Sequence, residues 1–202
     1  MTARAGHYFS PGPAAPSRPR LVRYRQRDRE FRFHTAAGVF SRGAVDRGTR
    51  LLLDAVDPAG AGRILDLGCG YGAIGIVMAA RAPDARVVLV DVNPLAVALA
   101  VENIATNAVP NAEARCGDGC AAVAGSGFDL ILFNPPIRAG RAVVMRLLRE
   151  ARDCLRPAGR LYLVARTGQG ARTLARLMGD LYGRVAETAR GGGYRVYEAS
   201  HV

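Results

Sequence analysis

The chain has 202 residues, of which 22% are charged, and its formal net charge is +11. This length allows one domain with a full hydrophobic core. No apolar run reaches the ~18 residues that a membrane span needs, and prolines interrupt the N-terminal stretch where a signal peptide would need an apolar core. We therefore expect a single soluble, cytoplasmic domain that is a monomer and has no membrane partner.

The excess of basic residues favours an anionic partner, and RNA is the first candidate. All 28 basic residues are arginine, a bias typical of GC-rich genomes that raises arginine content whatever the function. Bias alone does not explain the excess over 17 acidic residues, so RNA binding stays our expectation. Cys69, Cys116, Cys120 and Cys154 are too scattered for a disulfide framework and have no histidine nearby, which predicts reduced thiols and no metal site.

The N-terminal region is predicted to form an arm and a hairpin. Prolines and weak periodicity make residues 1–20 an extended arm, and residues 21–35 form a hairpin of two strands, Leu21–Glu30 and Phe31–Thr35. Arginines stand at every second position from Arg23 to Arg29, a spacing that places them on one face of a strand. Such a ridge could bind phosphates or could be a solvated edge that resists aggregation, and both interpretations stay open.

Residues 46–202 are predicted to form an α/β core. A helix over Asp46–Val56 follows the loop Gly38–Gly43. Strands are predicted at Arg63–Leu67, Arg86–Asp91, Ala112–Cys116, Asp129–Phe133 and Arg160–Ala165, with helices at Ala73–Arg81, Pro94–Asn107, Arg141–Leu155 and Gly170–Leu181. This alternation predicts a Rossmann-like, mostly parallel sheet with helices on both faces. Arg184–Ala189 and Tyr194–Ala199 then predict an antiparallel C-terminal hairpin at the sheet edge.

The glycine-rich stretch Asp66–Gly75 is the strongest local signal. It joins the end of a predicted strand to the start of a helix, and Gly70–Gly75 fits the dinucleotide pattern G-x-G-x-x-G. Glycines let a backbone bend sharply and approach a ligand closely. A dinucleotide and S-adenosylmethionine (SAM) are both compatible with this loop on its own.

Further strand ends carry polar residues, and in an open α/β sheet ligands bind at that edge. Asp91 lies about twenty residues after the glycines, a spacing that suits the hydroxyls of a ribose. Asp118 follows the third strand and could accept a bond from an adenine amino group. A carboxylate at Asp66 would oppose a pyrophosphate at the helix N-terminus, whereas SAM carries a cationic ammonium and sulfonium. The acidic residues therefore favour SAM.

The fourth strand ends in Asn134-Pro135-Pro136. Consecutive prolines end a strand, remove two backbone donors and fix the backbone. The side-chain oxygen of Asn134 and the carbonyl of Pro135 then provide two acceptors for one amino group. Such a pair can direct the lone pair of an exocyclic amine toward the methyl group of SAM, which needs orientation and little acid–base chemistry.

Taken together, these motifs resemble those of class I SAM-dependent methyltransferases, and within them the catalytic domain of small-subunit (16S) rRNA guanine-N2 methyltransferases. The resemblance covers nearly the whole chain. Its marks are Gly38-Val39-Phe40-Ser41-Arg42, Asp46 with Gly48-Thr49, the loop Asp66–Gly72, and Asn134–Gly140. It implies one methyltransferase domain over 1–202, a seven-stranded sheet, SAM as cofactor, and the N2 amine of a guanine in small-subunit rRNA or in the small ribosomal subunit as target.

The same resemblance implies roles for individual residues. The catalytic residues would be Asn134, Pro135, Pro136 and Ile137. The cofactor would contact Phe40, Ser41, Thr49, Asp66, Gly68, Cys69, Gly70, Gly72, Asp91, Asn93, Asp118, Gly119 and Asn134. The RNA substrate would contact Phe40, Arg42, Arg138 and Arg141.

Two departures from the family keep alternatives open. Ile137 stands where many amine methyltransferases have an aromatic residue that stacks on the target base, a contact worth ~1–3 kcal/mol; Phe40 is our candidate substitute. Longer family members also have an extra N-terminal domain. The rival functions are therefore a methyltransferase of a small-molecule or protein amide nitrogen, and a non-catalytic RNA-binding assembly factor with the same fold.

Overall fold

The computed structural model describes residues 20–201, and the side chain of His201 is not described. The arm expected over residues 1–20 lies outside this range, except for Arg20, which begins the first strand. In the described part of the chain, no helix is both long enough and apolar enough to cross a membrane.

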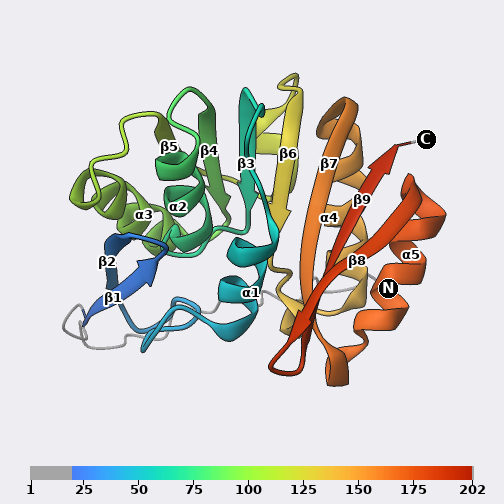
Figure 1. The fold of residues 1–202 in the computed structure, drawn as a ribbon, viewed down its shortest axis with the longest axis horizontal. Coiled ribbons are helices and arrows are strands. Elements are labelled where there is room, and N and C mark those ends of the chain that lie inside the picture. The colour runs from blue at the N-terminus through green and yellow to red at the C-terminus, as the bar shows by residue number, and fades with distance from the viewer. Residues whose placement is uncertain (1–19, 202) are drawn as a thin grey trace, which may run out of the picture.

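A seven-stranded sheet forms the centre of the molecule (Figure 1). Its strand order is β5-β4-β3-β6-β7-β9-β8, and β5, β4, β3, β6 and β7 run parallel. The last strand, β9, is antiparallel to both β7 and β8. The strands are β3 (Arg63–Leu67), β4 (Arg86–Asp91), β5 (Ala112–Cys116), β6 (Phe128–Phe133), β7 (Leu155–Arg166), β8 (Gly183–Gly191) and β9 (Tyr194–His201). The predicted Rossmann-like fold, with its antiparallel C-terminal hairpin, is confirmed.

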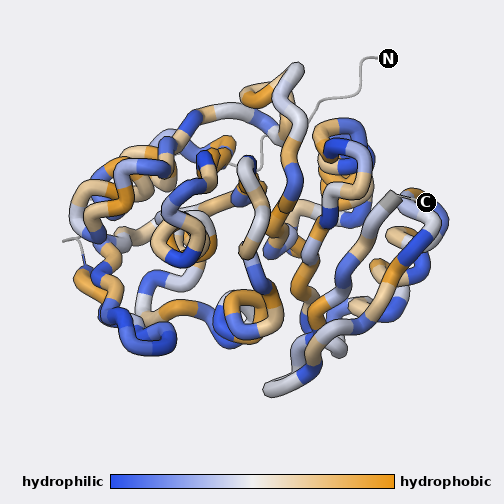
Figure 2. Tube along the Cα trace, turned by 45° about the horizontal axis from the view of Figure 1, so that its top comes forward, coloured by the Kyte–Doolittle hydropathy of each residue, from blue (hydrophilic) through white to orange (hydrophobic). Residues whose placement is uncertain are grey.

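Helices cover both faces of this sheet. They are α1 (Arg47–Ala55), α2 (Ala73–Arg81), α3 (Pro94–Thr106), α4 (Arg141–Cys154) and α5 (Ala171–Tyr182). Strand residues alternate between two cores: Leu130 and Leu132 of β6 pack with α1, α2 and α3, whereas Ile131 and Phe133 pack with α4 and α5. Burial on both faces explains why the central strands are apolar throughout. Figure 2 shows the helices carrying both hydrophobic and hydrophilic residues, as expected where only one side faces the sheet.

Most of the predicted bounds between α1 and α5 agree with the structure to within one residue, but β7 starts earlier than expected. Pro157 and Gly159 are typical of a turn, so the sequence predicts a loop there. In the structure Leu155 already pairs with Phe128, across an irregularity between Phe128 and Leu130. Tertiary pairing with β6 therefore extends the strand past its turn-forming residues.

The N-terminal hairpin consists of β1 (Arg20–Gln26) and β2 (Arg29–Thr35), which form a separate two-stranded sheet. The predicted continuous strand over 21–30 is wrong, because the chain turns at Arg27, whose φ is 50°. The predicted single ridge from Arg23 to Arg29 is wrong for the same reason. Arg23 and Arg25 are exposed on β1, whereas Arg29 pairs with Gln26 across the turn and donates to the backbone oxygen of Asn107.

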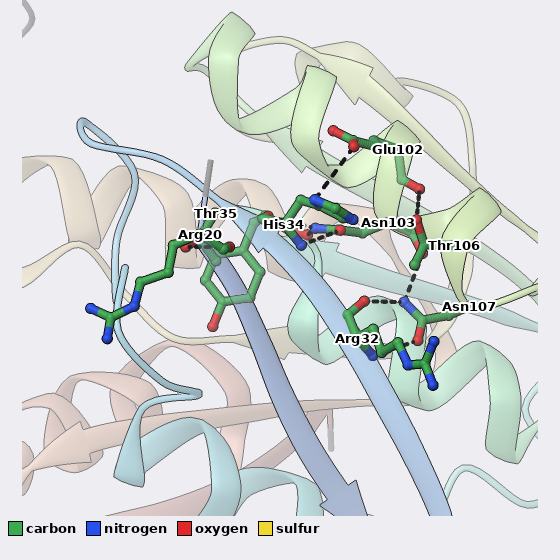
Figure 3. Close-up of polar contacts among 9 residues, drawn as sticks. Arg20, Arg32, His34, Thr35, Glu102, Asn103, Thr106 and Asn107 are labelled. Carbon is green, nitrogen blue, oxygen red and sulfur yellow. Dashed lines mark hydrogen bonds and ion pairs between the residues drawn. The ribbon is translucent and has the colours of Figure 1, made fainter. Parts of the chain in front are cut away.

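Asn103 of α3 and Asn107, which caps the C-terminal end of this helix, hold the hairpin against the core (Figure 3). Asn103 accepts a hydrogen bond from the backbone N–H of His34 at 2.6 Å and donates to the His34 carbonyl at 3.0 Å. Asn107 makes the same pair of bonds to Arg32, at 2.9 and 2.7 Å. The two amides thus satisfy alternate backbone groups along the edge of β2, as another strand would. Asn103 also donates to the Tyr71 carbonyl at 2.9 Å, which links the hairpin to the glycine-rich loop.

Replacing Asn103 should test this attachment. Asn103→Ala leaves the N–H of His34 and the carbonyls of His34 and Tyr71 without their partner, so we expect a loss of about 1–3 kcal/mol in the free energy of unfolding. Urea unfolding measures the loss. Thr106→Ala, at an exposed position of the same helix, is the control and should be close to neutral; equal losses in the two variants would contradict the proposed attachment.

Candidate active site

The predicted site residues gather at the edge of the sheet where the parallel strands β3, β4, β5 and β6 end (Figure 1). The loop after β3 is the first component. Gly68, Gly70 and Gly72 have φ values of 71°, 56° and 92°, a region that residues with a side chain rarely adopt. Gly75 serves a different purpose, because a Cβ there would lie 2.5 Å from Cγ of Leu89. The glycines therefore shape the loop and bring α2 close to β4.

The loop uses much of its hydrogen-bonding capacity internally. The carbonyl of Val90 accepts the N–H groups of Gly68 and Cys69, and the N–H of Gly72 donates to the Cys69 carbonyl. The N–H of Gly70 donates to Oδ2 of Asp91 at 2.8 Å. A pyrophosphate needs free N–H groups at this position, and these N–H groups are already engaged within the protein.

Asp66 is fully buried beneath the loop. Its Oδ2 accepts the N–H of Gly75 at 2.8 Å, so the carboxylate also binds the first turn of α2. Its Oδ1 is buried without a hydrogen-bond partner among the described residues. Burial raises the pKa of Asp66 to about 7, against the lowering effect of the Gly75 bond, and Asp91 raises it further. A nearby cation favours the ionised form of such a carboxyl group and a nearby anion disfavours it, so Asp66 suits a cationic ligand.

These features fit SAM better than a dinucleotide. A Cβ at Gly68 would meet no atom within 4 Å, so open space lies over the loop where a ligand can approach the backbone. Val39 flanks that space, because its Cγ1 would lie 3.9 Å from a Cβ at Gly70. The cationic methionine part of SAM suits the acidic residues below and beside the loop.

The acidic residues after β4 and β5 are placed differently. Asp91 is partly buried and holds the N–H groups of Gly70 and Asn93 with its two oxygens, so it shapes the loop and still faces the edge of the sheet. The Asn93 side chain caps α3 through the N–H of Leu95 and donates to the Gly38 carbonyl. Asp118 is exposed, and it forms an ion pair with Arg146 at 2.7 Å. A ligand at Asp118 would therefore share that carboxylate with Arg146.

Asn134 lies at the end of β6 with its amide nitrogen held from one side. Its Nδ2 donates to Oγ1 of Thr49 at 3.1 Å and to Oδ2 of Asp46 at 3.5 Å. No described residue donates to its Oδ1, which leaves that oxygen available as an acceptor. Pro136 has φ −74° and ψ 75°, an inverse γ-turn in which the Ile137 N–H donates to the Pro135 carbonyl at 2.8 Å. That carbonyl keeps its second lone pair.

The aromatic and basic candidates differ in exposure. Ile137 is partly buried and packs against the core formed with α4 and α5. Phe40 is 65% exposed, in the loop whose Gly38 carbonyl accepts from Asn93. Arg42, Arg138 and Arg141 are exposed.

Some predicted cofactor residues point elsewhere. Ser41, with φ 58°, donates its hydroxyl to the Ala44 carbonyl. Cys69 is buried, its thiol donates to the Gly70 carbonyl at 3.4 Å, and burial raises the pKa of that thiol. Gly119 is buried against Glu150. Thr49 bonds to Asn134, the residue predicted to hold the target amine.

Asp46 and Tyr194 connect to Asn134 through hydrogen bonds, but neither was predicted as a site residue. Asp46 precedes α1, and its Oδ2 accepts the Thr49 N–H at 3.1 Å. Tyr194 begins β9, and its hydroxyl donates to Oδ1 of Asp46 at 3.3 Å. The sequence signal at Asp46 is that of a helix N-cap, and Tyr194 follows three glycines in a hairpin. Neither signal indicates contact with residue 134.

Comparisons with known proteins agree with this geometry. The methyltransferase small domain family matches residues 30–198. YbxB of Bacillus subtilis (strain 168), described as an uncharacterised protein, is 36% identical over 198 residues, covering 97% of this chain and 98% of YbxB. The ribosomal RNA small subunit methyltransferase C of Pseudomonas fluorescens is 40% identical over 166 residues, covering 80% of this chain and 48% of that protein.

Among solved structures, the T. thermophilus 16S rRNA N2 G1207 methyltransferase in complex with AdoMet and guanosine superimposes with a TM-score of 0.82 at 30% identity. The match covers 94% of this chain and 52% of that one, so the chain spans about half the length of the two rRNA methyltransferases. The family match and the fold together define a SAM-dependent methyltransferase. The chain belongs to the methyltransferase small domain family, and the predicted cofactor, SAM, is confirmed.

Asp66 should give the stability of the protein a characteristic pH dependence. Its pKa is about 7 in the folded protein, against an ordinary value of 3.8, so between these two pH values the folded state binds the proton more tightly. The stability that protonated Asp66 contributes is fully present below the lower value and is lost as the pH rises through about 7. Urea unfolding should show the wild type losing stability with rising pH relative to Asp66→Asn, by at most ~1.4 kcal/mol per pH unit. Parallel pH curves for the two proteins would contradict this.

Proposed function

We propose that this protein transfers a methyl group from SAM to the exocyclic N2 amine of a guanine in small-subunit rRNA. The observation that carries the proposal is the orientation of Asn134, whose nitrogen is held by Thr49 and Asp46 and whose oxygen has no donor within the described chain. The likeness to an N2 G1207 methyltransferase structure over 94% of the chain supports the choice of guanine. We propose the cytoplasm as its location, because rRNA is found there in bacteria.

The chain's own residues have a limited chemical task. When bound, SAM supplies an activated methyl group, so the protein has to orient the amine and stabilise the charge that develops on its nitrogen. The Asn134 oxygen and the Pro135 carbonyl accept the two amine hydrogens. The γ-turn at Pro136 fixes that carbonyl. A guanine in a paired region has to leave its stack to reach these acceptors, unless it is presented before assembly.

The remaining site residues are assigned around these acceptors. Gly68, Gly70 and Gly72 would hold the methionine part of SAM above Asp66, while Asp91 would bind the ribose. Asp118 would bind the adenine with the lone pairs that Arg146 leaves free. Phe40 would stack on the target base, because it is exposed beside the loop while Ile137 packs against the core.

Two arginines at helix N-termini support an anionic substrate. None of α1 to α5 has an acidic residue in its first turn, although acidic residues there stabilise helices. Arg47 and Arg141 instead occupy the first helical positions of α1 and α4, where a positive charge is unfavourable for the helix. Neither arginine takes part in the ion pairs found in the described chain. Arg47 and Arg141 therefore remain available to a partner, although the Asp46 carboxylate caps α1 beside Arg47.

Labelled SAM should identify the substrate. The protein is incubated with SAM and, separately, with naked rRNA, small ribosomal subunits, total protein and whole-cell metabolites. We expect label in rRNA or subunits, recovered as N2-methylguanosine after digestion. Label only in protein or metabolites would replace the proposal by an amide-nitrogen methyltransferase, and label in no fraction despite RNA binding would indicate an assembly factor.

Asn134→Ala should separate cofactor binding from transfer. We expect kcat to fall by roughly 10²–10³, the usual cost of removing one positioned polar group from a transition state. SAM affinity, measured by calorimetry, should remain unchanged. Near-normal turnover in this variant would contradict the role of Asn134.

We expect Arg138 and Arg141 to bind phosphate groups of the RNA. Arg138→Gln and Arg141→Gln are each expected to weaken RNA binding equally for different sequences, and to lower the slope of log K against log salt by ~0.7–0.9 per lost contact. The control is Arg86→Gln, because Arg86 begins β4 at the opposite edge of the sheet and pairs with Glu113. An unchanged salt slope in both site variants would exclude them from the RNA interface.

A further inference from the structure

The site contains a polar chain that the methyl-transfer chemistry alone does not require: Tyr194, Asp46, Thr49 and Asn134. Its members come from β9, the start of α1 and the end of β6. Tyr194 and Asp46, which are 148 positions apart in the chain, are joined by a hydrogen bond. Asp46 is the centre. Its Oδ1 accepts from the Tyr194 hydroxyl at 3.3 Å, and its Oδ2 faces the N–H of Thr49 at 3.1 Å and Nδ2 of Asn134 at 3.5 Å.

The chemistry of these groups decides which way the Asn134 amide points. A threonine hydroxyl can donate or accept, so Thr49 would tolerate either end of the amide. An ionised carboxylate only accepts, and it would repel the amide oxygen. Asp46 therefore favours the orientation with Nδ2 toward α1 and Oδ1 away from it. The opposite orientation would present two donors to a substrate amine, which cannot accept them while its lone pair is the nucleophile.

The position of Tyr194 beside Asp46 depends on a small residue. A Cβ at Gly48 would lie 2.8 Å from ring atoms of Tyr194 and 2.9 Å from Oδ2 of Asp46. Gly48 thus allows the ring of β9 to pack on the start of α1. Burial and the neighbouring Asp46 raise the pKa of Tyr194, so its hydroxyl remains protonated and donates to the carboxylate.

We infer that Asp46 is a positioning residue for methyl transfer: together with Thr49 it orients the Asn134 amide so that Oδ1 faces the substrate amine, and Tyr194 holds Asp46 in place. The inference deepens the proposed function and rests on it for the identity of the amine. It also moves Thr49 from the cofactor pocket to the amine-binding side of the site.

The most direct test exchanges the two side chains, so that the carboxylate stands at position 134 and the amide at position 46; we call this double variant the reversed pair. Asn134→Asp places a second carboxylate opposite Asp46, so kcat should fall by on the order of 10² or more. Adding Asp46→Asn supplies an N–H that can donate to the new carboxylate, and its oxygen can still accept from Tyr194, although the bond from the Thr49 N–H is lost. We expect the double variant to recover on the order of tenfold over Asn134→Asp. Asp54→Asn on the same helix, where Asp54 bonds Gln26, is the matched control and should give no recovery.

Thr49 and Tyr194 provide a second set of variants. Thr49→Val keeps the shape and removes the hydroxyl, so kcat should fall while the Kd for SAM stays constant; Thr49→Ser should restore most of the activity. Tyr194→Phe should lower kcat less than Thr49→Val, and Tyr197→Phe on the same strand should leave it unchanged. Melting temperatures show whether each variant folds. If Thr49→Val instead raises the Kd for SAM at constant kcat, Thr49 contacts the cofactor, and this part of the inference is wrong.

A measurement without substrate keeps this inference separate from the proposed function. In the ¹⁵N-labelled protein, the side-chain amide signals of Asn134 are those that disappear in Asn134→Ala. They should shift on Asp46→Asn and Tyr194→Phe and stay in place on Asp54→Asn. These shifts in a protein that methylates no rRNA would refute the proposed substrate and leave the network intact. Unmoved amide signals, together with no recovery in the reversed pair, would overturn the inference.

Discussion

The site depends on one constraint, the way the backbone after β3 is tied to the end of β4. The Val90 carbonyl accepts two consecutive N–H groups of the loop, and the Asp91 carboxylate accepts a third. A chain can make these bonds only if Gly68, Gly70 and Gly72 take positive φ values. The consequence is chemical as well as structural. The N–H groups of Gly68, Cys69, Gly70 and Gly72 are engaged above a buried carboxyl group, which makes this loop a poor anion cradle for a dinucleotide. The same bonds that shape the loop therefore select against a phosphate and in favour of a cationic cofactor.

The loop is also connected to the periphery of the molecule. Asn103 bonds the edge of β2 with both ends of its amide, and the same side chain reaches the Tyr71 carbonyl within the loop. The N-terminal hairpin is thus fixed relative to the cofactor loop by a polar contact as well as by its apolar face. Its exposed side places Arg23 opposite Arg32, a like-charge pair that is unfavourable for the hairpin and is partly offset by the ion pair of Arg32 with Glu30. A rigid attachment and an unfavourable charge pattern on one small element are consistent with a surface that contacts RNA.

Local patterns were sufficient to predict much of this structure from sequence. The central strands are apolar runs between glycines and acids, and α2 to α5 have clear starts and ends, so fold class and most bounds follow from residues near in sequence. The failures have tertiary causes. Pairing with β6 extends β7 through Pro157, and Arg27 turns a predicted strand because β1 and β2 are a self-contained hairpin. The acidic residues at strand ends were found by spacing, but their partners were not. No spacing indicates that Arg146 would reach Asp118 or that Ser41 would turn its hydroxyl inward.

The orientation of Asn134 is the clearest case of information that sequence patterns do not carry. Asn-Pro-Pro at a strand end predicts two acceptors, yet an amide has a donor end and an acceptor end of nearly equal size. Which end faces the substrate depends on what lies behind it. Here a helix cap, Asp46, lies behind it, held in turn by a tyrosine from the last strand, with Gly48 leaving room for the ring. The C-terminal hairpin and the start of α1 thus lie behind the side chain for which we propose a catalytic role. If methyl transfer requires an acceptor at that point, the C-terminal hairpin contributes to catalysis as well as to the fold.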